Sequence, residues 1–246
     1  MRRLRTANLA LAAIHAGQAA LIVLIGATLA IPITAQWAVG PPGTEPGPTE
    51  TLFDLSVRWA VAAFLLMAAL DHLLVASPRI VSWYERNLGR GVNYARWIEY
   101  SFSASLMVVL IATFAGVTDL TALVAVAGVN AAMILFGLLM ERVNVGRDRL
   151  DWLPFWLGCI AGAVPWIVIG ISLVGSEMNG TVPGFVWGIF VSLFLLFNSF
   201  AVNMWLQYRR VGPWRDYLFG ERAYLVLSLV AKSALAWQIY AGALAG

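Results

Sequence analysis

The chain contains a single lysine, Lys232, and this lysine lies in the middle of an apolar segment. All other strongly basic side chains are arginines, so the lysine does not serve as a general surface charge. A charged side chain at the centre of a bilayer costs about 2.5–3.5 kcal/mol even on a lenient insertion scale. The amine can have a functional role, as an imine-forming nucleophile or as a cation that binds an anion. Alternatively, it can belong to a structural ion pair that joins two helices.

Glu99 is the candidate partner of Lys232, because it lies inside another long apolar segment. Two opposite charges that are each costly alone in a membrane are natural partners. Ser103 follows Glu99 by four residues, and Ser228 precedes Lys232 by four. Residues four apart share a helix face, so each hydroxyl can form a hydrogen bond beside its charge.

The only two histidines, His15 and His72, are both predicted to lie in the same half of the membrane. They could form a polar, hydrated pocket that holds a proton, or they could be two separate buried side chains. Without further clustered ligands we expect no metal site, and the lone Cys159 is expected to be a small buried hydrophobe. Asp71 lies near the end of its segment, so we expect it to be a solvated end charge.

Composition indicates a membrane protein. Of the 246 residues, 61% are hydrophobic and 12% are charged, about half the charged fraction of a soluble domain. No nucleic-acid motif or glycine-rich phosphate loop occurs. The first apolar run is longer than the apolar core of a signal peptide, so we expect it to be retained as a helix. Apolar runs of about 20 residues predict one all-α, rhodopsin-like domain over 1–246 with seven transmembrane helices at about 7–35, 55–77, 91–116, 120–141, 152–175, 184–208 and 219–244.

Arginine placement predicts the orientation of this bundle. Alternate connections are basic, and the intervening ones are acidic with only Arg58 near them. By the positive-inside rule the N-terminus is cytoplasmic and the C-terminus extracellular. The basic set is Arg2, Arg3, Arg5, Arg79, Arg86, Arg90, Arg96, Arg142, Arg147, Arg149, Arg209, Arg210, Arg215 and Arg222, and the acidic set is Glu45, Glu50, Asp54, Asp119 and Glu177.

Two segments carry a resemblance to a known family. The run from Arg96 to Met107, RWIEYSFSASLM, and the run from Ser228 to Gln238, SLVAKSALAWQ, resemble the third and seventh helices of the heliorhodopsins. These are retinal-binding seven-helix proteins with an inverted membrane orientation. The resemblance extends over the whole chain, and the residue types agree at Lys232, Glu99, Ser228, His15 and His72.

The resemblance implies that Lys232 carries all-trans retinal as a protonated Schiff base, with Glu99 as its counterion and Ser228 beside it. It implies that His15 and His72 form a proton-accepting polar cavity on the cytoplasmic side. The other candidate retinal-binding residues are Ser103, Tyr100, Asn130, Met133, Ile134, Gly137, Trp166, Phe197 and Trp237.

Members of the family form homodimers, and their first extracellular loop is an ordered hairpin. In this chain the predicted extracellular loop 37–54 is rich in proline and glycine, so we do not expect a regular hairpin.

The chemistry favours light sensing with photoisomerisation to 13-cis and a slow photocycle. An outward proton pump needs further carboxylates, but Leu110 and Ser228 occupy the positions concerned. A light-driven ion or proton transporter is the alternative, and a membrane enzyme that uses Lys232 without retinal is a third interpretation. We therefore expect a non-enzymatic photoreceptor of the plasma membrane, with an unknown cytoplasmic signalling partner.

Overall fold

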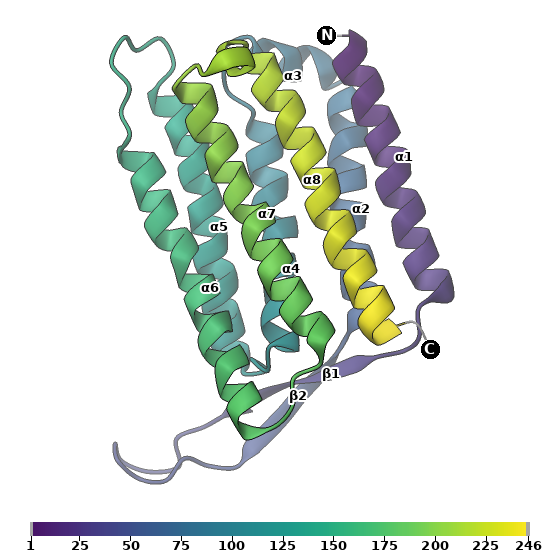
Figure 1. Cartoon of the computed structure of the whole chain (residues 1–246), viewed down its shortest axis with the longest axis vertical. Coiled ribbons are helices and arrows are strands. Elements are labelled where there is room, and N and C mark those ends of the chain that lie inside the picture. Colours follow the sequence, from purple (N-terminus) through teal and green to yellow (C-terminus); the bar gives the residue numbers. More distant parts are fainter. Residues whose placement is uncertain (1, 245–246) are drawn as a thin grey trace.

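The computed structural model describes residues 2–244, which form a bundle of long helices with a small β-hairpin at one end (Figure 1). Within this range, seven helices are long and apolar enough to cross a membrane, as predicted. They are α1 (Arg2–Ile25), α2 (Val57–Ala76), α4 (Tyr94–Phe114), α5 (Leu120–Val143), α6 (Leu153–Asn179), α7 (Gly184–Tyr208) and α8 (Tyr217–Ile239), which a short helical turn, η2 (Tyr240–Leu244), continues.

The hairpin corrects two predictions. The first helix was expected to reach residue 35, but α1 ends at Ile25, and β1 (Ala30–Gln36) pairs in antiparallel fashion with β2 (Thr49–Ser56). Residues 30–36 alternate in burial, with Ile33 and Ala35 facing the bundle, as a strand over a core does. The prediction of an irregular loop 37–54 was wrong because all of its prolines and glycines lie in the turn between the strands.

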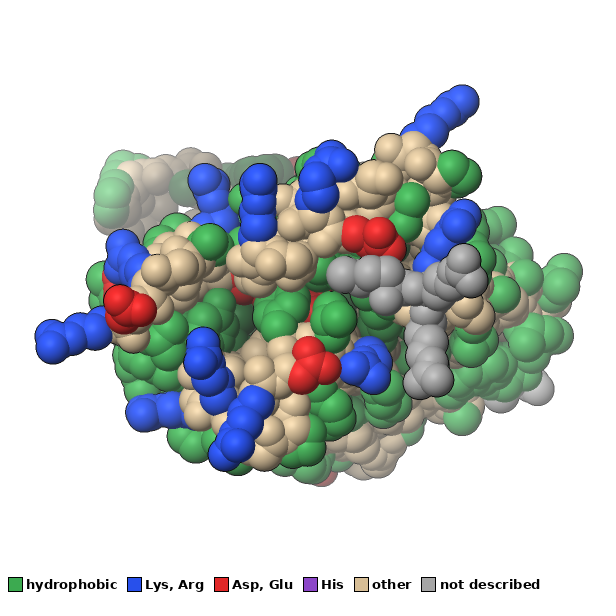
Figure 2. Space-filling view, turned by 90° about the horizontal axis from the view of Figure 1, so that it is seen from above, with side chains coloured by type: hydrophobic (Ala, Val, Ile, Leu, Met, Phe, Trp, Pro, Cys, Tyr) green, Lys and Arg blue, Asp and Glu red, His purple; other side chains and the backbone are tan. Residues whose placement is uncertain are grey.

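The opposite end of the bundle holds the start of α1 and a short helix that the sequence did not predict, α3 (Val81–Leu88). We call this the basic end, and the other the hairpin end. Figure 2 shows basic side chains spread around the face of the basic end, and all of them are arginines because the only lysine is buried. Its loops and helix ends contain Arg79, Arg86, Arg90, Arg142, Arg147, Arg149, Arg209, Arg210, Arg215 and Arg222.

Side-chain caps fix where three of the long helices begin. The third predicted helix was placed at residue 91, but α4 begins at Tyr94 because Asn93 Oδ1 accepts a hydrogen bond from the Arg96 amide at 3.1 Å. Asp119 caps α5 in the same way, and hydrogen bonds from the Thr121 hydroxyl and the Ala122 amide hold its pKa below the ordinary value. Asp216 caps α8. These caps set the register of the helices that carry the candidate site.

The apolar core divides along the bundle axis. A large cluster that includes Phe64, Leu110 and Leu235 fills the hairpin half. A smaller aromatic cluster, which includes Trp97 and Tyr224, lies toward the basic end. Outward-facing positions carry large apolar side chains, as expected for contact with lipid. The buried polar side chains, by contrast, face the inside of the bundle.

Candidate functional site

Lys232 and Glu99 form a buried ion pair at the centre of the bundle. Lys232 Nζ lies 3.2 Å from the Glu99 carboxylate and donates a second hydrogen bond to Ser228 Oγ at 3.0 Å. Lys232 is 3% exposed and Glu99 9%, so neither charge is solvated by bulk water. The Tyr100 ring centroid is 4.8 Å from the amine. The pairing predicted from the sequence is therefore present in the structure.

Helix geometry explains why Ser228 reaches the amine. Side chains on a helix lean toward its N-terminus, which for α8 is the basic end. Lys232 therefore extends back by one turn, past Ser228 and toward Glu99 on α4. Ser103, one turn beyond Glu99, is fully buried, but its hydroxyl has no hydrogen-bond partner among the described residues.

An apolar cavity of about 310 Å³ extends from Lys232 between α4, α5, α6 and α7. This volume lies near the lower end of the range of about 300–1,000 Å³ found for small-molecule pockets. Its lining fits a polyene such as retinal, because it is dominated by aromatic and aliphatic side chains and the amine lies in its wall. Eight of the predicted residues line it, namely Tyr100, Met133, Ile134, Gly137, Trp166, Phe197, Ser228 and Lys232.

Gly137 has a specific steric role in this cavity. A Cβ atom at this position would lie 2.4 Å from the Trp97 indole. Glycine therefore allows the indole of α4 to lie directly against α5.

Asn130 and Trp237 were also predicted to line the pocket, but they lie outside its lining. Asn130 donates to Ser105 Oγ, and Trp237 donates to Gln18 Oε1.

The cavity reaches the outer surface of the bundle between α6 and α7. Cys159 on α6 and Asn198 on α7 both line it and are both exposed. The expectation that Cys159 is a buried hydrophobe was wrong, because its side chain faces outward beside this opening. A hydrophobic ligand could enter from the lipid phase here.

The two histidines lie together, as the sequence suggested. Their rings are stacked with centroids 5.7 Å apart. Asn8, which the sequence analysis missed, orients His72: its amide nitrogen donates to the Leu4 carbonyl, so its oxygen faces His72 Nδ1 at 2.8 Å. His72 Nδ1 must then carry the hydrogen, which leaves Nε2 as the acceptor in the neutral ring.

His15 is fully buried, and neither of its ring nitrogens has a hydrogen-bond partner among the described residues. Ser103 Oγ lacks one as well. Buried polar atoms are almost always satisfied by protein or by ordered water. These three unpartnered atoms therefore indicate hydration between the histidines and the ion pair.

A second, small cavity of about 20 Å³ lies between Glu99 and the basic end. A space of this size holds about one water molecule. Asp71 lines it together with His72, Glu99 and Glu221. The expectation that Asp71 is a solvated end charge was wrong, because its side chain is half-buried and faces this internal space.

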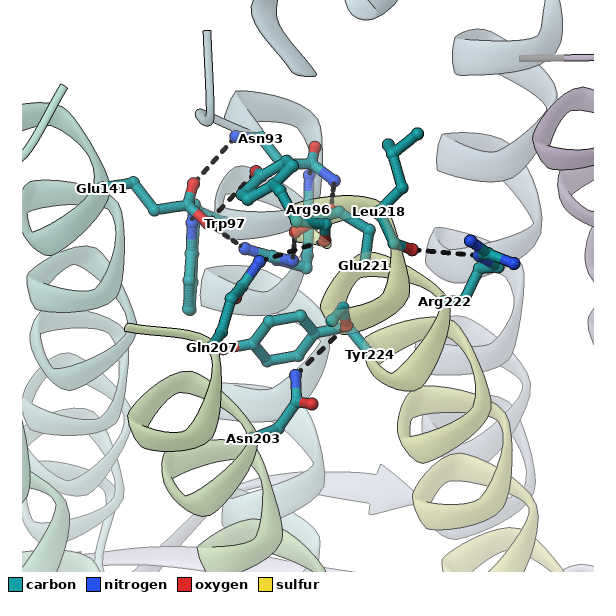
Figure 3. Close-up of polar contacts among 12 residues, drawn as sticks. Asn93, Arg96, Trp97, Glu141, Asn203, Gln207, Leu218, Glu221, Arg222 and Tyr224 are labelled. Atoms are coloured by element: carbon teal, nitrogen blue, oxygen red, sulfur yellow. Dashed lines mark hydrogen bonds and ion pairs between the residues drawn. The ribbon is translucent and has the colours of Figure 1, made fainter. Parts of the chain in front are cut away.

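A second buried charge cluster lies closer to the basic end (Figure 3). Arg96 on α4 lies between Glu141 on α5 and Glu221 on α8 and forms an ion pair with each. All three side chains are at most 4% exposed. Trp97 Nε1 and the Asn93 backbone amide also donate to Glu141, at 2.7 and 2.8 Å.

This cluster was not predicted, and Arg96 was counted among the basic-end cations instead. Helical spacing contained the signal. Glu141 lies on the same face of α5 as Gly137 and Ile134, at four and seven residues. Glu221 lies seven residues before Ser228 and eleven before Lys232, which places it on the inward face of α8.

Comparison with known proteins decides the family. The heliorhodopsin family model matches residues 4–244. The chain belongs to the heliorhodopsin family. It is thus a multi-pass membrane protein of the rhodopsin class, and membership implies a retinal chromophore. The family resemblance inferred from the Lys232 and Glu99 segments is confirmed. No curated protein matches the chain.

Solved structures share the fold at low sequence identity. The light-driven proton pump of Leptosphaeria maculans has a TM-score of 0.67 at 15% identity, over 97% of this chain and 94% of that one. The light-driven proton pump of Coccomyxa subellipsoidea has 0.65 at 17%, over 96% and 93%. The transmembrane domain and linker region of the Salpingoeca rosetta rhodopsin phosphodiesterase has 0.64 at 14%, over 98% and 79%.

Proposed function

We propose that this chain is a light-sensing photoreceptor in which all-trans retinal is bound covalently to Lys232 as a protonated Schiff base, with Glu99 as the counterion. The observation that carries the proposal is the buried Lys232–Glu99 pair, 3.2 Å apart, whose amine lies in the wall of an apolar cavity large enough for a small ligand. Amine, anion and cavity together supply what a buried, charged imine requires.

When bound, retinal would supply light absorption and isomerisation to 13-cis, which displaces the nitrogen and its proton relative to the protein. Glu99 stabilises the positive charge on the nitrogen, and Ser228 offers a hydrogen-bond partner on the same helix. Because both groups are buried, their interaction with the charge is weakly screened by solvent. Moving the charged nitrogen away from Glu99 therefore lowers the proton affinity of that nitrogen.

We propose that the released proton stays in the basic half of the protein. The candidate acceptors there are Glu99, His15 and His72. His15 has unpartnered buried nitrogens that water would satisfy, and His72 has an acceptor nitrogen in the tautomer that Asn8 selects. A proton held in this hydrated group would give a slow photocycle and a signalling state.

Signalling is favoured over pumping because the described part of the chain contains no charged outward relay. The buried acids among the described residues are Glu99, Glu141 and Glu221, and none lies between Lys232 and the hairpin end. Leu110 is fully buried in the apolar core of the hairpin half. Two of the fold neighbours are light-driven proton pumps, so light-driven ion transport is the alternative function.

The orientation, location and partners belong to the same proposal. The arginines gathered at the basic end favour placing that end and the N-terminus in the cytoplasm and the C-terminus outside. We also propose that the protein lies in the plasma membrane, forms a homodimer and acts on an unidentified cytoplasmic signalling partner.

A visible spectrum tests the proposal. The purified protein with added all-trans retinal should develop a visible absorption band that hydroxylamine bleaches under illumination. Absence of any band would contradict it and would favour a membrane enzyme that uses Lys232 without retinal.

A further inference from the structure

The buried charges in the basic half do not balance. Among the described residues, the buried cations are Arg96 and Lys232, whereas the buried acids are Glu99, Glu141 and Glu221. Lys232 forms an ion pair with Glu99, and Arg96 forms ion pairs with both Glu141 and Glu221. If all five groups are ionised, this region already carries one uncompensated negative charge.

Asp71 adds a fourth acid to this region, and its contacts differ from those of the others. Glu99, Glu141 and Glu221 each accept a hydrogen bond from a cation. The described residues offer the Asp71 carboxyl neither a hydrogen bond nor an ion pair. It is nevertheless half-buried and lines the small cavity that also contacts Glu99 and Glu221.

The other groups around this cavity do not supply the missing positive charge. The titratable or charged side chains that line it with Asp71 are His72, Tyr84, Arg96, Glu99, Tyr100 and Glu221. Arg96 is already shared by two carboxylates. Burial, followed by the nearby Glu221 charge, raises the pKa of Tyr84, so this phenol stays neutral. Like charges in one low-dielectric space favour the neutral form of one member.

Asp71 also bridges two environments. It lies next to His72 on α2, near the basic end of that helix, and it keeps some exposure while it also lines the internal cavity. A cavity that holds about one water can connect this carboxyl to Glu99 by a single hydrogen-bonded molecule.

We propose that Asp71 is a neutral carboxylic acid in the dark and is the proton-exchange residue of this chain, through which the buried Glu99–Lys232 site exchanges protons with water at the basic end. This rests on the proposed function in that the proton concerned is the one on the Lys232 nitrogen. In each exchange a proton from the Asp71 carboxyl passes through the cavity water toward Glu99 and Lys232, and the proton that it replaces returns through the same water to Asp71. Asp71 then releases this proton to water at the basic end and takes up another, so one proton enters the site and one leaves it. No net charge is moved.

Two measurements test the proposal. Infrared spectra of the dark protein, with or without retinal, should contain the carbonyl stretch of a protonated carboxylic acid. The band should shift when aspartate, but not glutamate, is isotopically labelled, and it should be lost in Asp71→Asn.

Resonance Raman spectra of the pigment after transfer to heavy water should report the exchange rate of the nitrogen-bound proton. Asp71→Asn should slow this exchange on the order of 10²-fold, the usual scale of general acid–base catalysis, and Asp71→Glu should restore it.

The exposed Asp148 is the matched control, because Asp148→Asn makes the same change on a basic-end loop away from the cavity. It should leave both the band and the exchange rate unchanged. A band that follows glutamate labelling alone, or exchange in Asp71→Asn at the wild-type rate, would overturn the proposal. If Asp71→Asn does not fold, the proposal is tested by the infrared spectrum of the labelled wild type and by the exchange rate in Asp71→Glu. Failure of the wild-type protein to form a pigment would instead refute the proposed function, and the infrared arm would still decide the dark state of Asp71.

Discussion

Replacing Glu99 by glutamine removes the negative charge nearest to Lys232 and keeps the size of the side chain. At 3.2 Å and an effective dielectric constant of about 20, the attraction between two unit charges is about 5 kcal/mol. Since one pH unit corresponds to about 1.4 kcal/mol, the midpoint of imine deprotonation should fall by up to about 4 pH units. The glutamine amide dipole will recover part of this, so we expect a fall of at least about 2 units.

The assay is the visible absorption of the retinal-loaded protein as a function of pH. The protonated pigment of Glu99→Gln should absorb to the red of the wild type, because the positive charge is then less localised at nitrogen. Glu99→Asp is the control, since it keeps the charge and should retain most of the wild-type midpoint. A Glu99→Gln titration that superposes on the wild type would refute the assignment of Glu99 as counterion.

Four further predictions address the remaining parts of the site. Lys232→Ala and Lys232→Arg should abolish the visible chromophore, because neither side chain forms the imine and no other lysine exists; a pigment in Lys232→Ala would disprove the retinal linkage. Illuminated vesicles should show no sustained, uncoupler-sensitive pH change, and a reproducible one at physiological pH would establish transport instead. His15→Phe and His72→Phe should each alter the photocycle rate without abolishing deprotonation, and the double variant should change it by more than the sum if the stacked rings share one network; flash spectroscopy with a soluble pH dye measures this, and wild-type kinetics in the double variant would contradict it. Arg96→Met should destabilise the protein by about 3–5 kcal/mol, because it leaves two buried carboxylates without their cation; thermal unfolding of the pigment, with the exposed Arg149→Met as control, would show an unchanged midpoint if the cluster were unimportant.

Predictions from sequence succeeded where a local property decided the outcome. A run of apolar residues must cross lipid as a helix, because only helical backbone satisfies its own hydrogen bonds there. A charge inside such a run is costly wherever the helix lies, so Lys232 and Glu99 could be recognised before any contact was known. Their pairing followed from having few candidates.

The hairpin shows the limit of local patterns. Residues 30–36 are apolar enough to continue a helix, and they form a strand only because residues 49–56 supply the opposite edge. That pairing depends on a turn and a register that lie outside the segment. For the same reason the prolines and glycines of the connection did not prevent the two strands from pairing.

Arg96 and Asp71 show what tertiary structure alone decided. By sequence both lie near the ends of their helices, where a charge is usually solvated. Arg96 is buried because Glu141 and Glu221, 45 and 125 residues away, meet it from two other helices. Asp71 faces inward because α2 packs against α1, α4 and α8 around a cavity. The sequence by itself determined how many spans cross the membrane and which charges need partners. Which end charges are buried depends on how the helices are rotated against one another, and the summed packing of the whole bundle sets that rotation.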